Sequence, residues 1–122
     1  MDISDAESIV MEVLWLRSPR TADEVIAELA SAQDWQEPTI RTLLNRLLNK
    51  GAIGAQKDGR RYLYSAVLQR EDWVNRQSRS LLNRLFEGRV APLVAHFSEQ
   101  GKLSKKDIAE LKKLIEGLDD ER

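Results

Sequence analysis

The stretch PTIRTLLNRLLNKG at residues 38–51, followed by KDGRRYLY at residues 57–64, decides the fold of this chain. Proline is favoured in the first turn of a helix, where its missing N–H leaves no hydrogen bond unmade. Glycine is favoured just past a helix end, because it adopts the left-handed backbone conformation without steric cost. Pro38 and Gly51 therefore predict the two ends of one helix, and Lys50 lies where the helix dipole favours a positive charge.

The predicted helix has an apolar face and a polar face. At about 100° per residue, its apolar side chains fall within one arc. These are Ile40, Leu43, Leu44, Leu47 and Leu48. Thr42, Asn45 and Asn49 point the opposite way, with Arg41 and Arg46 on the two flanks. Hydroxyl, amide and guanidinium groups suit base edges and phosphates, so this face predicts a helix that enters the major groove of DNA.

A basic hairpin is predicted directly after this helix. Residues 52–56 and 61–66 favour two short antiparallel strands, and Asp58-Gly59 is a strong two-residue turn signal. Arginines at a loop tip can extend along a phosphate backbone or into a minor groove. Helix and hairpin together indicate a winged helix-turn-helix in a mainly α chain. The predicted DNA-binding residues are Thr39, Arg41, Thr42, Asn45, Arg46, Lys57, Arg60 and Arg61.

Two further helices are predicted before this unit. Ser4 is followed three residues later by Glu7, which is the pattern of a capping box at a helix start. The same spacing recurs at Thr21 and Glu24, which indicates that a second helix begins there. Residues 1–67 are therefore predicted to form a winged-helix DNA-binding domain.

Length and composition bound the class of protein. The 122 residues allow one modest domain, or a small domain with an appended helical segment. No apolar run approaches the roughly 20 residues that span a bilayer, and the acidic N-terminus is unlike a secretory signal. The absence of cysteine excludes disulfides and cysteine-ligated zinc. A cytoplasmic protein without membrane insertion is expected.

The charges are segregated along the chain. The net charge is −1, but residues 1–34 hold eight acids against two bases and residues 35–66 hold six bases against two acids. These segments therefore carry −6 and +4. A local basic island is typical of a surface that binds a polyanion. A solvated face without a partner is the alternative explanation of the same charges.

No enzyme, metal or cofactor site is predicted. His96 is the one histidine and lacks a cysteine or a clustered carboxylate beside it, which makes a poor metal site. Neither a nucleophile elbow nor a phosphate-binding glycine loop is present. Trp15, Trp35 and Trp73 are interpreted as core or interface residues rather than as ligand-stacking groups.

Residues 68–122 are predicted to form a helical dimerisation region. Three helices with apolar stripes follow a winged unit whose core is already supplied, and a twofold dimer is the commonest way to cover such surface. In the alternative, these helices fold back onto their own domain. The predicted dimerisation residues are Trp73, Leu81, Leu82, Leu85, Phe86, Ile108, Leu111, Leu114, Ile115 and Leu118.

Short motifs along nearly the whole chain carry a family resemblance. They are ISDAE (3–7), VM (10–11), LW (14–15), DW (34–35), TIRTL (39–43), RL (46–47), KG (50–51), RYLY (61–64), LS (103–104) and EL (110–111). In this order they resemble the penicillinase-repressor family of bacterial transcription regulators, BlaI/MecI/CopY. The resemblance implies a homodimeric winged-helix repressor that binds an inverted repeat of double-stranded DNA, often with TACA and TGTA half-site cores.

The resemblance also implies a way to end repression. In the antibiotic-resistance members, a membrane sensor-protease system acts upstream, and the repressor is cut at an Asn-Phe bond in its dimerisation region. The corresponding pair here is His96-Phe97, in which the asparagine is replaced. The cysteine pairs with which copper-responsive members bind metal are absent. Two other functions stay open: a winged-helix protein-interaction module, and a DNA-binding activator or architectural protein.

Overall fold

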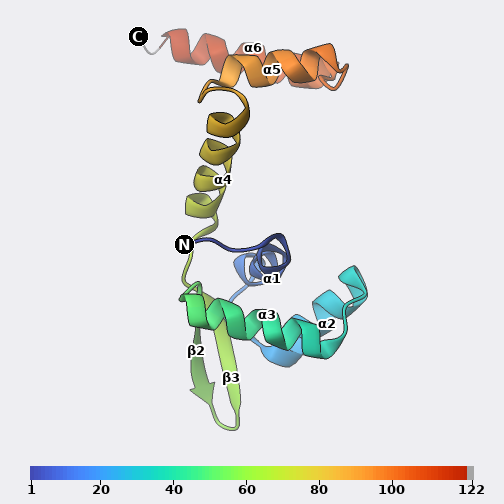
Figure 1. Ribbon diagram of the computed structural model, residues 1–122, viewed down its shortest axis with the longest axis vertical. Coiled ribbons are helices and arrows are strands. Elements are labelled where there is room, and N and C mark those ends of the chain that lie inside the picture. Colours follow the sequence, from blue (N-terminus) through green and yellow to red (C-terminus); the bar gives the residue numbers. More distant parts are fainter. Residues whose placement is uncertain (121–122) are drawn as a thin grey trace. The chain divides into compact units, whose positions relative to one another are not determined.

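The computed structural model describes residues 1–119 in full and the backbone of residue 120. The chain divides into two compact units, residues 1–74 and 75–122 (Figure 1). The elements in chain order are α1 Asp5–Leu16, β1 Arg20–Thr21, α2 Ala22–Gln33, α3 Glu37–Lys50, β2 Ile53–Asp58, β3 Arg61–Ala66, α4 Arg70–Leu85, α5 Val90–Glu99 and α6 Lys105–Asp120.

The helix ends follow the local chemistry of the sequence. Both predicted capping boxes are confirmed: the Ser4 hydroxyl accepts from the Glu7 backbone N–H, and the Thr21 hydroxyl accepts from that of Glu24. In each box the glutamate side chain accepts from the backbone N–H of the capping residue, so two donors at each helix start are satisfied. Gly51 ends α3 with a φ of 78°, as its glycine predicts.

The sheet differs from the predicted hairpin in two respects. Its strand order is β1-β3-β2, because the two residues of β1 pair with β3, opposite Tyr64 and Leu63. The predicted turn at Asp58-Gly59 is wrong by one residue: Asp58 pairs with Arg61, so Gly59 and Arg60 form the loop. Gly59 has a positive φ of 66°. Among the four residues of the turn, 58–61, it is the one that tolerates this conformation without strain.

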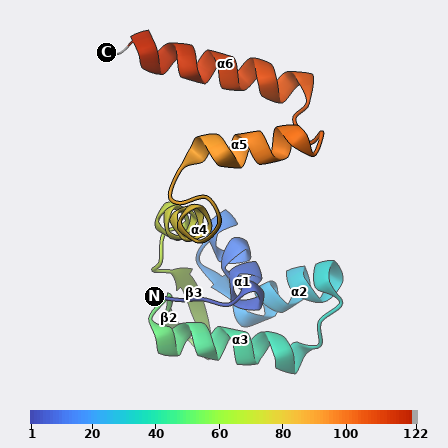
Figure 2. The same cartoon turned by 45° about the horizontal axis from the view of Figure 1, so that its top comes forward.

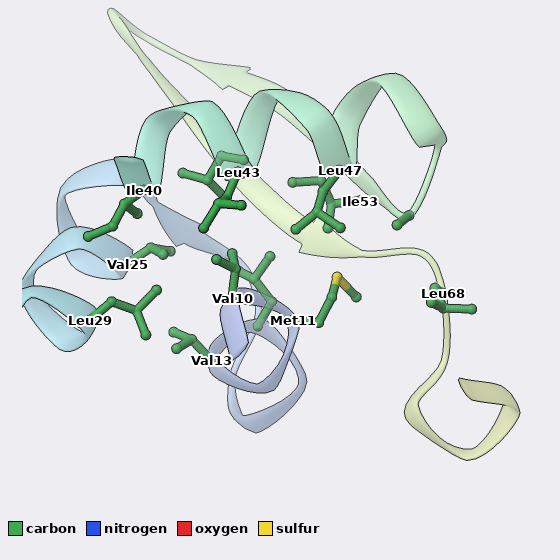
Figure 3. Close-up of a cluster of buried hydrophobic side chains, with 13 residues drawn as sticks. Val10, Met11, Val13, Val25, Leu29, Ile40, Leu43, Leu47, Ile53 and Leu68 are labelled. Atoms are coloured by element: carbon green, nitrogen blue, oxygen red, sulfur yellow. The ribbon is translucent and has the colours of Figure 1, made fainter. Parts of the chain in front are cut away.

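The core of the first unit lies among α1, α2, α3 and the base of the hairpin. In Figure 3 the apolar side chains of α3 point toward those of α1 and α2. The buried hydrophobic residues are Val10, Met11, Val13, Leu14, Val25, Leu29, Ile40, Leu43, Leu44, Leu47, Ala52, Ile53 and Leu68. This arrangement of three helices and a β-hairpin is a winged helix-turn-helix.

The first unit extends beyond residue 67, where the sequence predicts the domain boundary. Leu68 is buried in the core, and its carbonyl accepts a hydrogen bond of 2.7 Å from the indole N–H of Trp15. The ring centroids of Trp15 and Trp73 are 5.5 Å apart. The first turn of α4 is therefore packed against α1, and the unit ends at Val74.

The second unit consists of the rest of α4, then α5 and α6. Gly88, with a φ of 75°, follows the end of α4, and Gly101, with a φ of 68°, lies between α5 and α6. Figure 2 shows α5 and α6 running in opposite directions. No helix among the described residues is long and apolar enough to cross a membrane.

Candidate nucleic-acid interface

The polar face of α3 is exposed. Thr39, Arg41, Thr42, Asn45 and Arg46 all lie at the surface, while the opposite face of the helix is buried in the core. The Thr42 hydroxyl donates to the Pro38 carbonyl at 2.9 Å, so its hydrogen is already used within the helix. Helix α3 thus presents donors and acceptors in the chemistry that base edges and phosphates recognise.

The wing presents three cations. Lys57, Arg60 and Arg61 are exposed at the end of the hairpin that projects from the helices in Figure 1. Arg61 pairs with Asp58 across the loop at 3.4 Å. Lys57 and Arg60 form no ion pair with any described residue, so their charges are available to an anion.

A groove of about 300 Å³ brings the wing and α3 together. It is lined by Thr21, Ala22, Asp23, Arg41, Arg60, Arg61, Tyr62 and Tyr64. Three of the predicted DNA-binding residues, Arg41, Arg60 and Arg61, therefore meet on one surface although 20 positions separate the first from the last. The start of α2 and the two tyrosines were not predicted, because no local pattern links them to α3.

The guanidinium of Arg41 is held by two carboxylates. Its Nε donates to Glu37, one helical turn earlier, at 2.9 Å. Its Nη2 lies 3.5 Å from the carboxylate of Asp23 on α2. Arg46, the other arginine of α3, makes no ion pair within the described part of the chain. The two arginines of α3 are therefore in different electrostatic states.

The far end of α3 is anchored to α1 by a buried acid. Glu7 is 1% exposed, and its Oε1 accepts from the Lys50 ammonium at 2.5 Å and from the Ser4 backbone N–H at 2.7 Å. Burial raises the pKa of Glu7, but the hydrogen bonds from Lys50 and Ser4 together lower it by more than burial raises it. The pKa of Glu7 therefore lies below its ordinary value. Lys50 also donates to the carbonyl of Asp2 at 3.0 Å.

The predicted dimerisation residues fall into two groups. Trp73 lies in the first unit and is partly buried against Trp15. The others belong to the second unit, where Leu82, Phe86 and Leu111 are half-buried. The exposed members are Leu81, Leu85, Ile108, Leu114, Ile115 and Leu118.

The predicted cleavage pair lies within α5. The His96 ring contacts those of Phe86 and Phe97 at interplanar angles of 54° and 74°, with ring centroids 6.0 and 5.3 Å away. The Phe97 side chain is 43% exposed. Both residues of the pair are thus at the surface of the unit to which they belong.

Comparison with known proteins identifies the family. The family model described as penicillinase repressor matches residues 3–117. The penicillinase repressor of Bacillus licheniformis is 40% identical over 114 residues, which cover 93% of this chain and 89% of that protein. The methicillin resistance regulatory protein MecI of Staphylococcus aureus strain N315 is 33% identical over 114 residues, which cover 93% of each.

Solved structures of related repressors match more than half of the chain. The solution structure of the DNA-binding domain of the repressor BlaI has a TM-score of 0.55 and 42% identity, covering 58% of this chain and 87% of that one. The Bacillus licheniformis BlaI monomer in complex with the blaP half-operator has a TM-score of 0.53 and 42% identity, covering 59% of this chain and 88% of that one. The predicted winged-helix fold is confirmed. The chain belongs to the penicillinase repressor family.

Proposed function

We propose that this chain is a DNA-binding transcriptional repressor that binds an inverted-repeat operator as a homodimer in the cytoplasm. The observation that supports this most directly is the groove in which Arg41 of α3 lies with Arg60 and Arg61 of the wing. Two elements suited to DNA thus place arginines on one face, where Arg60 has no described ion pair and Arg41 pairs with Asp23. The relative BlaI, whose structure was solved with a half-operator, supports the same function. In this function the chain is a regulator and has no catalytic role.

The residues of the interface divide into base contacts and phosphate contacts. Five residues on the exposed face of α3 are proposed to contact base edges in the major groove. They are Thr42, Asn45 and Arg46, together with Thr39 and Arg41 near the start of the helix. Lys57, Arg60 and Arg61 on the wing are proposed to hold phosphates or the minor groove.

The second unit is proposed to join two copies of the chain. No side chain in residues 75–119 is fully buried, so these three helices lack a core of their own. Leu114 and Leu118 are 65% and 63% exposed and lie on one face of α6, where they line a groove with Gly117. A twofold dimer would cover this apolar surface and present two winged units to the two halves of a palindrome.

Repression is proposed to end by cleavage between His96 and Phe97, triggered by a membrane sensor-protease system. A bond inside a helix must leave the helix before a protease can bind it. Helix α5 contains no fully buried residue, which favours local opening at low cost. The cut would separate α6 from the rest of the chain and so remove part of the proposed dimer interface.

A binding experiment tests the DNA function. The chain is used to select sequences from a randomised duplex pool, and its affinity for the selected duplex and for a scrambled duplex is measured by fluorescence anisotropy at several salt concentrations. A repressor should prefer an inverted repeat, whereas a protein-interaction module should select no sequence.

The wing assignment is tested with Arg60→Ala. This variant should weaken binding to both duplexes and reduce the slope of log K against log salt by about 0.9 for each phosphate that the wing no longer neutralises. Unchanged affinity and an unchanged slope would show that the wing does not contact DNA. Promoter fusions would then separate repression from activation.

A further inference from the structure

Among the described residues of the proposed DNA interface, Arg41 is the one cation that forms ion pairs with two carboxylates. Glu37 lies 2.9 Å from its Nε and Asp23 lies 3.5 Å from its Nη2. The three side chains come from two helices: Glu37 and Arg41 are one turn apart on α3, and Asp23 is in the first turn of α2. We call this set the acidic clamp.

The acidic clamp lies on the same face as the wing cations. Asp23 and Arg41 line the groove that Arg60 and Arg61 also line. The Asp23 side chain is 91% exposed, so its carboxylate would meet any polyanion that enters this groove. By contrast, the neighbouring cations Arg46, Lys57 and Arg60 form no ion pair with described residues.

The net charge of the acidic clamp opposes binding that depends only on phosphate contacts. Two carboxylates and one guanidinium leave a local charge of −1, whereas the free arginine would contribute +1. Non-specific binding depends almost entirely on phosphate neutralisation, so it loses the contribution of Arg41. A guanine edge accepts hydrogen bonds that Nη1 can donate without Arg41 leaving its carboxylates, whereas a phosphate carries a negative charge that the two carboxylates repel.

We infer that Asp23, with Glu37, withholds Arg41 from phosphates and thereby raises the preference of this chain for its operator over other DNA. Asp23 is a positioning residue that acts through Arg41. The acidic clamp stays closed in the operator complex, because the guanidinium can donate to a base edge through Nη1 while Nε and Nη2 keep their carboxylates. This inference rests on the proposed function.

Neutralising Asp23 tests the inference. The full chain carrying Asp23→Asn is compared with wild type on the duplex that the wild type selects from a random pool and on a scrambled duplex. Glu12→Gln is the matched control, because Glu12 also forms an exposed pair with one arginine, Arg70, at 3.1 Å. That pair lines a different groove, with Trp15 and Leu16, and the variant changes the net charge equally.

Asp23→Asn should tighten binding to the scrambled duplex by about two- to fivefold, the range expected from one exposed ion pair. Its salt slope on that duplex should steepen by about 0.9 for each protomer, because Arg41 then neutralises one more phosphate. Affinity for the selected duplex should change less than twofold, so the preference ratio should fall. Glu12→Gln should change neither ratio nor slope.

An Arg41→Ala background separates the acidic clamp from simple repulsion. If Asp23 acts through Arg41, the steepening of the salt slope by Asp23→Asn should disappear in that background, because no arginine is left at position 41 to contact the additional phosphate. If the full effect persists, or if Asp23→Asn behaves like Glu12→Gln, the inference is overturned while the proposed function stands. A wild-type chain that selects no sequence overturns the proposed function and the inference with it.

Discussion

Substituting Lys50 by methionine tests whether the Lys50–Glu7 pair holds α3 against α1. The Glu7 side chain is 2% exposed, whereas that of Lys50 is 38% exposed. Methionine keeps most of the aliphatic chain of lysine and removes the ammonium. The buried carboxylate would then retain the Ser4 backbone N–H as its donor among the described residues. Its other oxygen, Oε2, already has no partner among them.

The expected reduction in stability follows from these exposures. A hydrogen bond to a charged group contributes about 1.5–3 kcal/mol, and breaking a fully buried ion pair costs about 3–5 kcal/mol. Because Lys50 is more than a third exposed, water can replace part of its contact with Glu7. We therefore expect the free energy of unfolding to fall by about 1.5–3 kcal/mol. For a unit of this size, the thermal midpoint should fall by about 6–24 °C.

The reduction should also depend on pH. In the wild type, the folded pKa of Glu7 is lowered, so its contribution to stability is present above the unfolded pKa and is lost as pH falls through the folded pKa. Without the ammonium, burial should raise the pKa of Glu7 instead. The difference in unfolding free energy between the two chains should therefore be largest near pH 7. It should shrink as pH falls through the raised pKa of the variant toward the ordinary pKa of glutamate, about 4.3, and vanish as pH falls through the lowered pKa of the wild type.

Urea unfolding followed by circular dichroism at pH 7 and pH 4 measures both effects. Lys57→Met is the control, because it makes the same chemical change at an exposed wing position that has no described ion pair. Equal midpoints for Lys50→Met and Lys57→Met at pH 7 would refute the proposed anchor. A pH-independent reduction would show that Glu7 is not the partner through which Lys50 acts.

Four further predictions concern the second unit and the end of α3. Leu114→Asp should yield a folded monomer in sedimentation with operator affinity reduced at least about tenfold, since each copy then binds alone; a variant that stays dimeric would place the interface elsewhere. A chain ending at His96 lacks α6 and should behave likewise, whereas undiminished dimerisation would exclude α6 from the interface. Gly51→Ala should lower the unfolding free energy by about 1–2 kcal/mol, because φ is +78° there with no atom within 4 Å of the added carbon. Gly117→Ala in α6, with equal space and no positive φ, should instead stabilise its helix by about 1 kcal/mol, and equal effects at both glycines would contradict the backbone explanation.

Local signals in the sequence are enough to predict most of the winged unit. The two capping boxes, the apolar arc of α3 and Gly51 each act within one or two helical turns, so their residues are close in the sequence as well as in space. The hairpin is predicted as well, but with its loop displaced by one residue. Asp-Gly favours several turns, and the pairing of Asp58 with Arg61 decides among them.

The remaining features depend on contacts between distant residues. The two residues of β1 are too few for an alternating pattern, and their pairing with β3 spans more than 40 positions. The contact of Asp23 with Arg41 spans 18 positions, and that of Glu7 with Lys50 spans 43. Each of these acids also has a sufficient local explanation, in a helix first turn or a capping box. Composition and periodicity therefore give no reason to pair them with a particular cation.

Because β1 is only two residues long, the wing is stiffer at its base than at its tip. Only Leu63 and Tyr64 of β3 are paired on both sides, with β1 and with β2. From Tyr62 to the loop, the wing is a two-stranded ribbon, and such a ribbon is marginally stable without a third strand or a packed face. The base of the wing thus fixes its direction, while the tip that holds Lys57 and Arg60 can bend. A compliant tip can follow phosphate paths that differ from one DNA sequence to another, and the rigid core need not move.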